Sequence, residues 1–159
     1  MKRFLPVFLA ILLLLSFTGL VDAQKIVDTA DGPEVWVTSV YNNSTSTISA
    51  GDIVVWDISS STGDNDNYVN TTTTADTTLA AGIVWPADIA GKSIGSIAIR
   101  ATGITVNTLG GTTVPTSLCT SGTTGRADAC SESAGDPNRV GYCTAADSSK
   151  SCVAYISVL

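Results

Sequence analysis

The chain has no histidine, a single methionine and few charged side chains. Of its 159 residues, 14% are charged and 6% are aromatic. Histidine is the commonest general acid–base group and the usual partner of a nucleophilic serine or cysteine. Its absence argues against a histidine-dependent hydrolase and against a zinc site with imidazole ligands. We therefore predict that the protein is not an enzyme.

Carboxylates are the remaining acid–base and metal-binding candidates. Asp52 and Asp57 flank a short apolar run, and we interpret them as a turn residue and a solvated strand end. Asp64 and Asp66 lie in the segment Gly63–Asn67, where oxygen side chains alternate as at the start of a calcium loop. The Gly and the downstream Glu of an EF-hand are missing, and a polar turn held by Asx hydrogen bonds is the alternative. No cofactor is expected, and calcium at Asp64 and Asp66 is the single metal that the pattern admits.

The N-terminus has the three-part pattern of a secretory signal peptide. Lys2 and Arg3 give a positive start, residues 4–15 form an apolar run, and residues 21–23 end the segment with small-x-small character. The apolar run is shorter than the about 20 residues that span a bilayer. We expect cleavage after Ala23 (signal peptide 1–23) and no membrane span in the mature chain.

Cleavage would make the mature chain, residues 24–159, more acidic. It removes two basic residues and one acidic residue, which leaves six basic and thirteen acidic residues and a net charge of −7. An acidic surface disfavours nucleic acid and anionic lipid as partners. The length suits one domain with a buried core. We therefore expect a single-domain protein that is secreted, either extracellular or at the cell surface, and that binds no nucleic acid.

Four cysteines, Cys119, Cys130, Cys143 and Cys152, lie in the last third of the chain. An even number in an exported chain indicates disulfides, for which three pairings exist. A zinc site is disfavoured because there is no CxxC spacing. We favour Cys119–Cys130 and Cys143–Cys152, since the second pair is symmetric about the centre of a predicted hairpin, as opposed positions on its two strands would be.

Strand signals dominate the mature chain, and helical periodicity is absent. The pattern predicts one all-β domain, a small β-barrel or β-sandwich of short antiparallel strands, stapled by disulfides. A Gly/Thr/Ser-rich region at 107–138 is predicted to be a loop-rich insertion. The β-branched and aromatic runs that predict strands are 34–41, 53–57, 68–74, 78–85, 93–101, 103–106, 139–143 and 152–159.

Aromatic residues are few, and each tryptophan lies in a predicted strand. A flat row of tryptophans binds sugar rings, but such residues are more often core or interface anchors. Trp56 and Trp85 are the candidates for glycan contact. The N-terminal segment 24–49 carries an apolar strand that is predicted to pair with a neighbouring subunit. Its predicted interface residues are Val35, Trp36, Val37, Val40 and Tyr41.

Three asparagines, Asn42, Asn43 and Asn70, begin Asn-x-Ser/Thr matches to the N-glycosylation pattern. In a bacterial host such matches would usually be accidental.

Three stretches together resemble a known family. They are 51–56 (GDIVVW), 81–99 (AGIVWPADIAGKSIGSIAI) and 139–159, which begins RVGY and ends in a strand. Their order is similar to that in the small β-barrel decoration and head-fibre proteins of tailed phages and their prophage relatives. This resemblance implies a barrel that forms oligomers and coats or extends a larger assembly without catalysis. The signal peptide, the cysteines and the 107–138 insertion depart from the family, whose members assemble in the cytoplasm.

The sequence is compatible with two functions. The leading hypothesis is a structural subunit that self-assembles into an extracellular fibre, tube or surface coat, with other copies of itself as its partner. The alternative is a secreted carbohydrate- or surface-binding module with glycans as its ligands. Export, low charge and the absence of a catalytic constellation favour the first.

Overall fold

A computed structural model describes residues 25–27, 34–58, 67–110, 114–130, 139–148 and 150–158. The predicted signal peptide and the calcium candidates Asp64 and Asp66 lie outside these residues. The described chain is all-β, as predicted. Its strands are β1 Lys25–Val27, β2 Val35–Asn42, β3 Ile53–Trp56, β4 Tyr68–Asn70, β5 Ala80–Val84, β6 Ile94–Asn107, β7 Thr116–Thr120, β8 Ala127–Ala129, β9 Gly141–Ser148 and β10 Ser151–Ser157.

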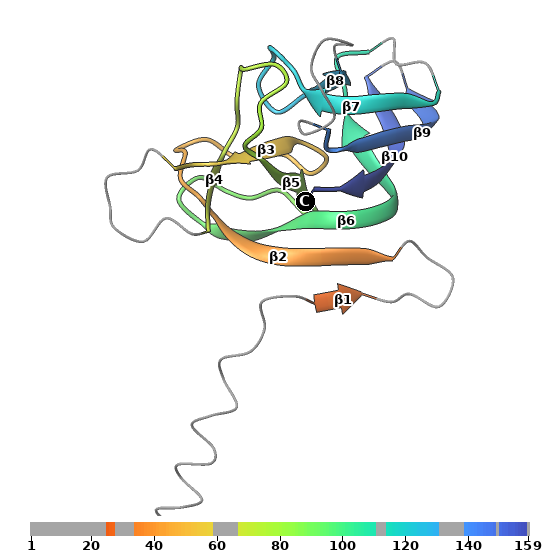
Figure 1. Cartoon of the computed structure of the whole chain (residues 1–159). Coiled ribbons are helices and arrows are strands. Elements are labelled where there is room, and N and C mark those ends of the chain that lie inside the picture. Colours follow the sequence, from red (N-terminus) through yellow and green to blue (C-terminus); the bar gives the residue numbers. More distant parts are fainter. Residues whose placement is uncertain are drawn as a thin grey trace, which may run out of the picture.

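Five strands close into a small barrel (Figure 1). Their order is β2-β4-β3-β5-β6, and pairing of β6 with β2 closes the ring. The barrel is mixed, because β2 and β4 are parallel while its other pairs are antiparallel. This parallel pair departs from the predicted antiparallel arrangement. It arises because β4 turns back from β3 into the space beside β2 and so runs in the direction of β2.

The long strand β6 connects the barrel to the remaining strands. Its first half pairs with β2 and β5, and its second half pairs with β10, beyond which lie β9, β7 and β8. Between Thr102 and Ile104 the register with β10 skips Gly103, whose φ is 74°. A glycine in the left-handed region accommodates such a β-bulge and bends the strand. The two predicted strands 93–101 and 103–106 are therefore one bent strand, seen curving upward in Figure 1.

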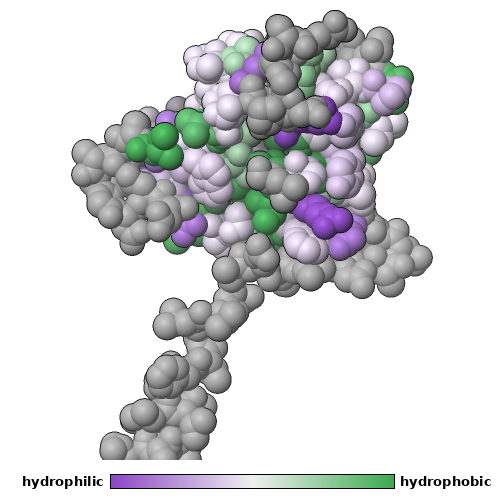
Figure 2. Space-filling view, viewed as in Figure 1, coloured by the Kyte–Doolittle hydropathy of each residue, from purple (hydrophilic) through white to green (hydrophobic). Residues whose placement is uncertain are grey.

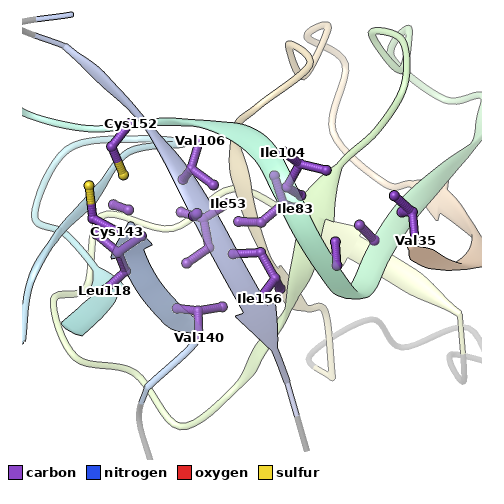
Figure 3. Packing of buried hydrophobic residues seen from close by; sticks show 14 residues of the cluster. Val35, Ile53, Ile83, Ile104, Val106, Leu118, Val140, Cys143, Cys152 and Ile156 are labelled. Carbon is purple, nitrogen blue, oxygen red and sulfur yellow. The ribbon is translucent and has the colours of Figure 1, made fainter. Parts of the chain in front are cut away.

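Two apolar clusters fill this architecture. The barrel core draws on all five barrel strands and contains Val40, Ile48, Val54, Val69, Ala81, Val84, Ile89 and Ile97. The second core lies between the barrel and the outer strands (Figure 3), and its larger members include Val35, Ile53, Ile83, Ile104, Leu118 and Ile156. Strand β3 serves both cores, because its successive residues Ile53 and Val54 point to opposite faces. This explains why its sequence is continuously apolar instead of alternating.

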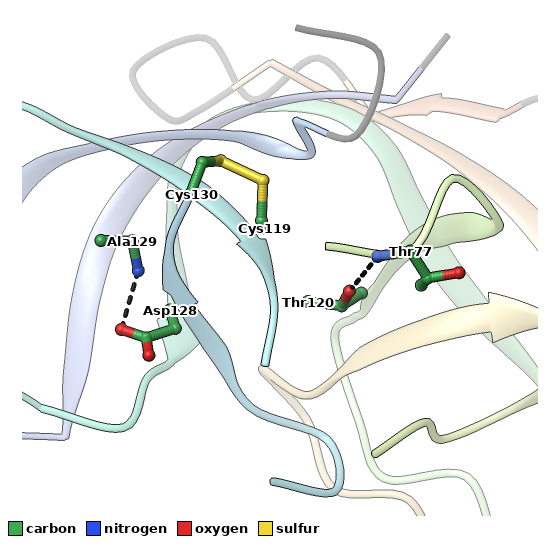
Figure 4. Close-up of a disulfide and its surroundings, with 6 residues drawn as sticks. All are labelled: Thr77, Cys119, Thr120, Asp128, Ala129 and Cys130. Atoms are coloured by element: carbon green, nitrogen blue, oxygen red, sulfur yellow. Dashed lines mark hydrogen bonds between the residues drawn. A yellow bond between two sulfur atoms is a disulfide. The ribbon is translucent and has the colours of Figure 1, made fainter. Parts of the chain in front are cut away.

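The region 107–138 contains more regular structure than predicted. Strands β7 and β8 form an antiparallel hairpin within it, in which Cys119 faces Asp128. A disulfide joins Cys119 to Cys130 just beyond the hairpin pairing, with 5.0 Å between the Cα atoms (Figure 4). The predicted Cys119–Cys130 bond is thus confirmed. The prediction of a loop-rich insertion missed this hairpin, because its short Thr/Ser/Ala strands carry little apolar signal.

The outer surface carries few strongly apolar residues. The described part of the face in Figure 2 is mostly pale, with small hydrophobic and hydrophilic patches. Among the described residues, large apolar side chains that remain exposed are Ile58, Leu79, Ile94, Leu109 and Val114.

Candidate functional site

Strand β1 extends the sheet beyond the closed barrel. It pairs antiparallel with β2, with Lys25 opposite Val37, Ile26 opposite Trp36 and Val27 opposite Val35. Within the described chain β2 is its sole strand neighbour, and β1 ends the strand order. Since β2 is already paired with β6 and β4, the barrel closes without β1. This edge is the candidate assembly site.

The predicted interface residues on β2 divide into two groups. Val35 is 1% exposed and Val40 is 2% exposed, and they belong to the second core and the barrel core respectively. The prediction that these two side chains lie at an interface is wrong, because both are buried within the fold of the subunit. Trp36, Val37 and Tyr41 are half-buried and remain candidates for contact with another copy.

Trp36 is held in place by two polar neighbours. Its Nε1 donates a hydrogen bond to Glu34 Oε1 over 2.9 Å. The guanidinium carbon of Arg100, its register partner on β6, lies 5.1 Å from the ring centroid, which is a cation–π contact. The ring is therefore ordered at the position that faces Ile26 of β1 in the register.

A second surface feature lies at the other end of β2. The rings of Tyr41 and Tyr68 have centroids 4.9 Å apart, and these residues are register partners across the parallel pair. On the other side, Tyr41 faces Ile94, which is 77% exposed. Sequence patterns did not indicate a role for Tyr68 or Ile94, because these two residues reach Tyr41 from separate strands.

The tryptophans predicted to contact glycans do not share one apolar cluster. Trp56 is half-buried against the barrel core, and Trp85 is half-buried against the second core. Their packing agrees with the interpretation of tryptophans as core residues. Glycan contact by Trp56 or Trp85 stays a prediction.

Cys143 and Cys152 are free thiols, so the predicted bond between them is not formed. Both side chains are fully buried in the second core and point toward each other in Figure 3. In the register Cys143 faces Ala154 and Cys152 faces Ala146, because bulges shift the pairing along the hairpin. Symmetry in sequence therefore does not make them directly opposed. Burial, reinforced by a hydrogen bond and charge interaction with Cys143, raises the pKa of Cys152 to about 12.

The carboxylate of Asp76 lies beside the disulfide. Ligand atoms of Asp76, Cys119 and Cys130 lie within 4.8 Å of one another. The two sulfurs are bonded to each other, so neither is available as the thiolate that a metal ion requires. Asp76 is positioned by its backbone amide, which donates to Thr120 O over 2.9 Å. This cluster is therefore a structural disulfide beside the loop that Asp76 fastens to β7.

Asp52 and Asp57 flank β3, as predicted. Asp52 accepts hydrogen bonds from Asn107 Nδ2 at 2.8 Å and from the amide of Ser49 at 3.2 Å. Asp57 accepts one from Asn43 Nδ2 at 2.8 Å. These contacts give both carboxylates roles in holding turns.

No known protein family, curated protein or solved structure matches the chain. The fold therefore stands as a small five-stranded barrel with added strands and a disulfide, without an assigned family. In the part of the chain that the structure describes, no helix has the length and apolar character to cross a membrane.

Proposed function

We propose that the protein is a non-catalytic structural subunit that self-assembles into an extracellular fibre, tube or surface coat. The observation that carries this proposal is the position of β1, which adds to β2 outside a barrel that closes without it. The export predicted from residues 1–23 would deliver the subunit to the place of assembly.

Exchange of β1 between copies is the proposed mode of assembly. A β1 strand from a second copy can make the same backbone hydrogen bonds to β2 that the chain's own β1 makes. The exchange therefore replaces one pairing by an identical one. Three residue pairs form a weak contact alone, so a neighbour needs further contact near Trp36 to hold firmly.

This mode gives an open-ended polymer. The donated strand and the accepting edge are different surfaces of the subunit, so each copy can give β1 to one neighbour and receive β1 from another. Such head-to-tail contacts form filaments unless the rotation between copies closes a ring. A fibre or tube is thus the form that the proposal favours.

Deletion of residues 24–33 tests the proposal. The deletion ends before β2, because removing β2 as well would open the barrel. We expect a folded monomer by thermal melting and size-exclusion chromatography, while the unaltered protein gives ordered polymers in negative-stain images. Ile26→Pro, which removes a backbone donor from β1, should reproduce the loss, and Ile26→Val should not. Polymers formed by the deletion variant would contradict the proposal.

A carbohydrate- or surface-binding module is the second candidate. The Tyr41–Tyr68 pair favours it, since adjoining aromatic rings offer apolar faces with polar tips to a sugar. Binding of the monomeric deletion variant to a glycan array, lost in Tyr68→Ala, would support this function. Absence of array binding would leave the Tyr pair as a surface contact within the subunit.

A further inference from the structure

The three Asn-x-Ser/Thr matches lie in different structural settings, and these settings separate them. N-glycosylation forms a bond to the side-chain amide nitrogen, so an acceptor in a folded protein needs an accessible Nδ2 that no other group holds. The three sites therefore differ in the hydrogen-bond partners of Nδ2 in Asn42, Asn43 and Asn70.

Asn42 is fully enclosed. It is 0% exposed, and its Nδ2 lies within hydrogen-bond distance of three backbone carbonyls. These carbonyls belong to Ser46 at 2.9 Å, Ile89 at 3.1 Å and Ala90 at 3.1 Å. Releasing this nitrogen would break these bonds in the buried interior, where an unsatisfied polar group costs about 1–3 kcal/mol. Asn42 is therefore a structural residue of the barrel.

Asn43 is held by charged groups on both atoms of its amide. Its Nδ2 donates to Asp57 Oδ2 over 2.8 Å, and its Oδ1 accepts from Lys92 Nζ over 3.0 Å. The backbone around it is also fixed, since the amide of Lys92 donates to the carbonyls of Asn42 and Ser44. Charge-assisted hydrogen bonds are stronger than neutral ones, so this side chain is not free to react.

Asn70 differs from both. It ends β4 and is half-exposed, and its Oδ1 accepts a hydrogen bond from the amide of Thr71 over 2.9 Å. The described residues give its Nδ2 no hydrogen-bond acceptor. Val69 before it points into the barrel core, so the side chain of Asn70 lies on the other face of the strand.

The chain after Asn70 suits entry into an enzyme's active site. Residues 71–74 have no regular secondary structure, and Thr73 and Thr74 are exposed. The amide of Thr74 bonds Thr72 Oγ1 within the same segment, over 3.0 Å. The segment is fastened to β7 further along, at Asp76. It can therefore adapt locally while the barrel stays folded.

We propose that Asn70 is the N-glycosylation acceptor of the folded protein, with a lipid-linked oligosaccharide as the co-substrate. The inference rests on the predicted export and is independent of self-assembly. In the reaction Nδ2 attacks the anomeric carbon of a sugar carried on a polyprenyl diphosphate. The new C–N bond replaces the C–O bond, the diphosphate leaves with the electron pair, and a transferase base takes the amide proton. The hydroxyl of Thr72 supplies the third position of the recognised pattern.

In vitro glycosylation of the folded, oxidised full chain tests the proposal. The oligosaccharyltransferase is chosen for its ability to modify a synthetic peptide of residues 67–75. Intact mass and glycopeptide mapping should show a single glycan at Asn70. It should be lost in Asn70→Gln and Thr72→Ala, and kept in Asn43→Gln and Thr72→Ser. Thermal melting of each variant checks that the fold is retained.

Two results would overturn the inference. One is transfer to the peptide with none to the folded protein, which would show that the barrel hides Asn70. The other is a glycan at Asn42 or Asn43 of the folded chain, which would show that their hydrogen bonds do not protect them.

Discussion

Asn107, the last residue of β6, donates a hydrogen bond from Nδ2 to Oδ1 of Asp52 over 2.8 Å. The same nitrogen lies 3.0 Å from the carbonyl of Ala50, and the backbone amide of Asn107 donates to Gly51 O over 2.8 Å. The turn before β3 is thus fastened to the far end of β6, where β6 pairs with β10. This contact couples the two halves of the fold.

We expect Asp52→Ala to lower the free energy of unfolding by about 1.5–3 kcal/mol, the range for hydrogen bonds to a charged group. Asp52→Asn keeps an acceptor oxygen and should cost less. In urea unfolding with the disulfide intact, Asp52→Ala and Asn107→Ala should show a coupling energy, because each removes the same bond. Strictly additive effects would show that the bond contributes nothing.

Gly141 and Gly122 form a matched pair for testing backbone packing. A Cβ at Gly141 would lie 2.0 Å from the carbonyl oxygen of Tyr155, whereas the atom nearest to a Cβ at Gly122 would be Thr73 O, at 3.9 Å. Gly141→Ala must therefore push β9 away from β10, and we expect a loss of more than about 3 kcal/mol or failure to fold. Gly122→Ala should change stability by less than about 0.5 kcal/mol. Equal effects in thermal melts would contradict the strand pairing described.

The two buried thiols should be unreactive in the native state. Cys143 and Cys152 are 0% exposed, and the thiolate, not the thiol, is the nucleophile. An alkylating reagent at neutral pH should label no cysteine in the folded protein and both of these in denaturant without reductant. Mass spectrometry counts the labels. No labelling of the denatured chain would show that all four cysteines are bonded.

The pKa of Cys152 predicts a stability change at alkaline pH. The folded pKa of about 12 lies above the ordinary value of 9.0, so the fold favours the neutral thiol. The stabilisation is complete below pH 9 and is lost as the pH rises toward 12, because the unfolded chain releases its proton first. Between pH 9 and pH 12 the free energy of unfolding should fall more steeply with pH in the unaltered protein than in Cys152→Ala. The difference in slope should reach about 1.4 kcal/mol per pH unit. Parallel curves of unfolding free energy against pH for the two proteins would contradict the raised pKa of Cys152.

Local patterns in the sequence were sufficient for much of the fold. Apolar runs at 53–57 and 78–85 gave β3 and β5, and the closing hairpin followed from alternation around a polar turn. Asp52 and Asp57 were correctly placed at the ends of a strand. In each case the residues that decide the structure are neighbours in the chain.

Features that depend on distant pairing could not be predicted. The insertion of β4 beside β2 brings Tyr41 to Tyr68, and closure by β6 adds Ile94. Hairpin bulges displaced Cys143 from Cys152, although their spacing was symmetric. Segment 24–49 was predicted to pair with a neighbouring subunit, yet β2 within it closes the barrel. Register and strand order set these outcomes, and neither is encoded in composition or spacing alone.

Cross-linking of residue 26 to residue 36 tests the exchange of β1 most directly. These positions are register partners, and directly opposed strand residues have Cα separations that suit a disulfide. In assembled Ile26→Cys/Trp36→Cys protein, we predict a ladder of covalent multimers on a non-reducing gel. Lys25→Cys/Trp36→Cys, whose cysteines would face opposite sides of the sheet, should give no ladder. Cross-linked monomers alone from the first variant, in preparations that contain polymers, would contradict strand exchange as the basis of assembly.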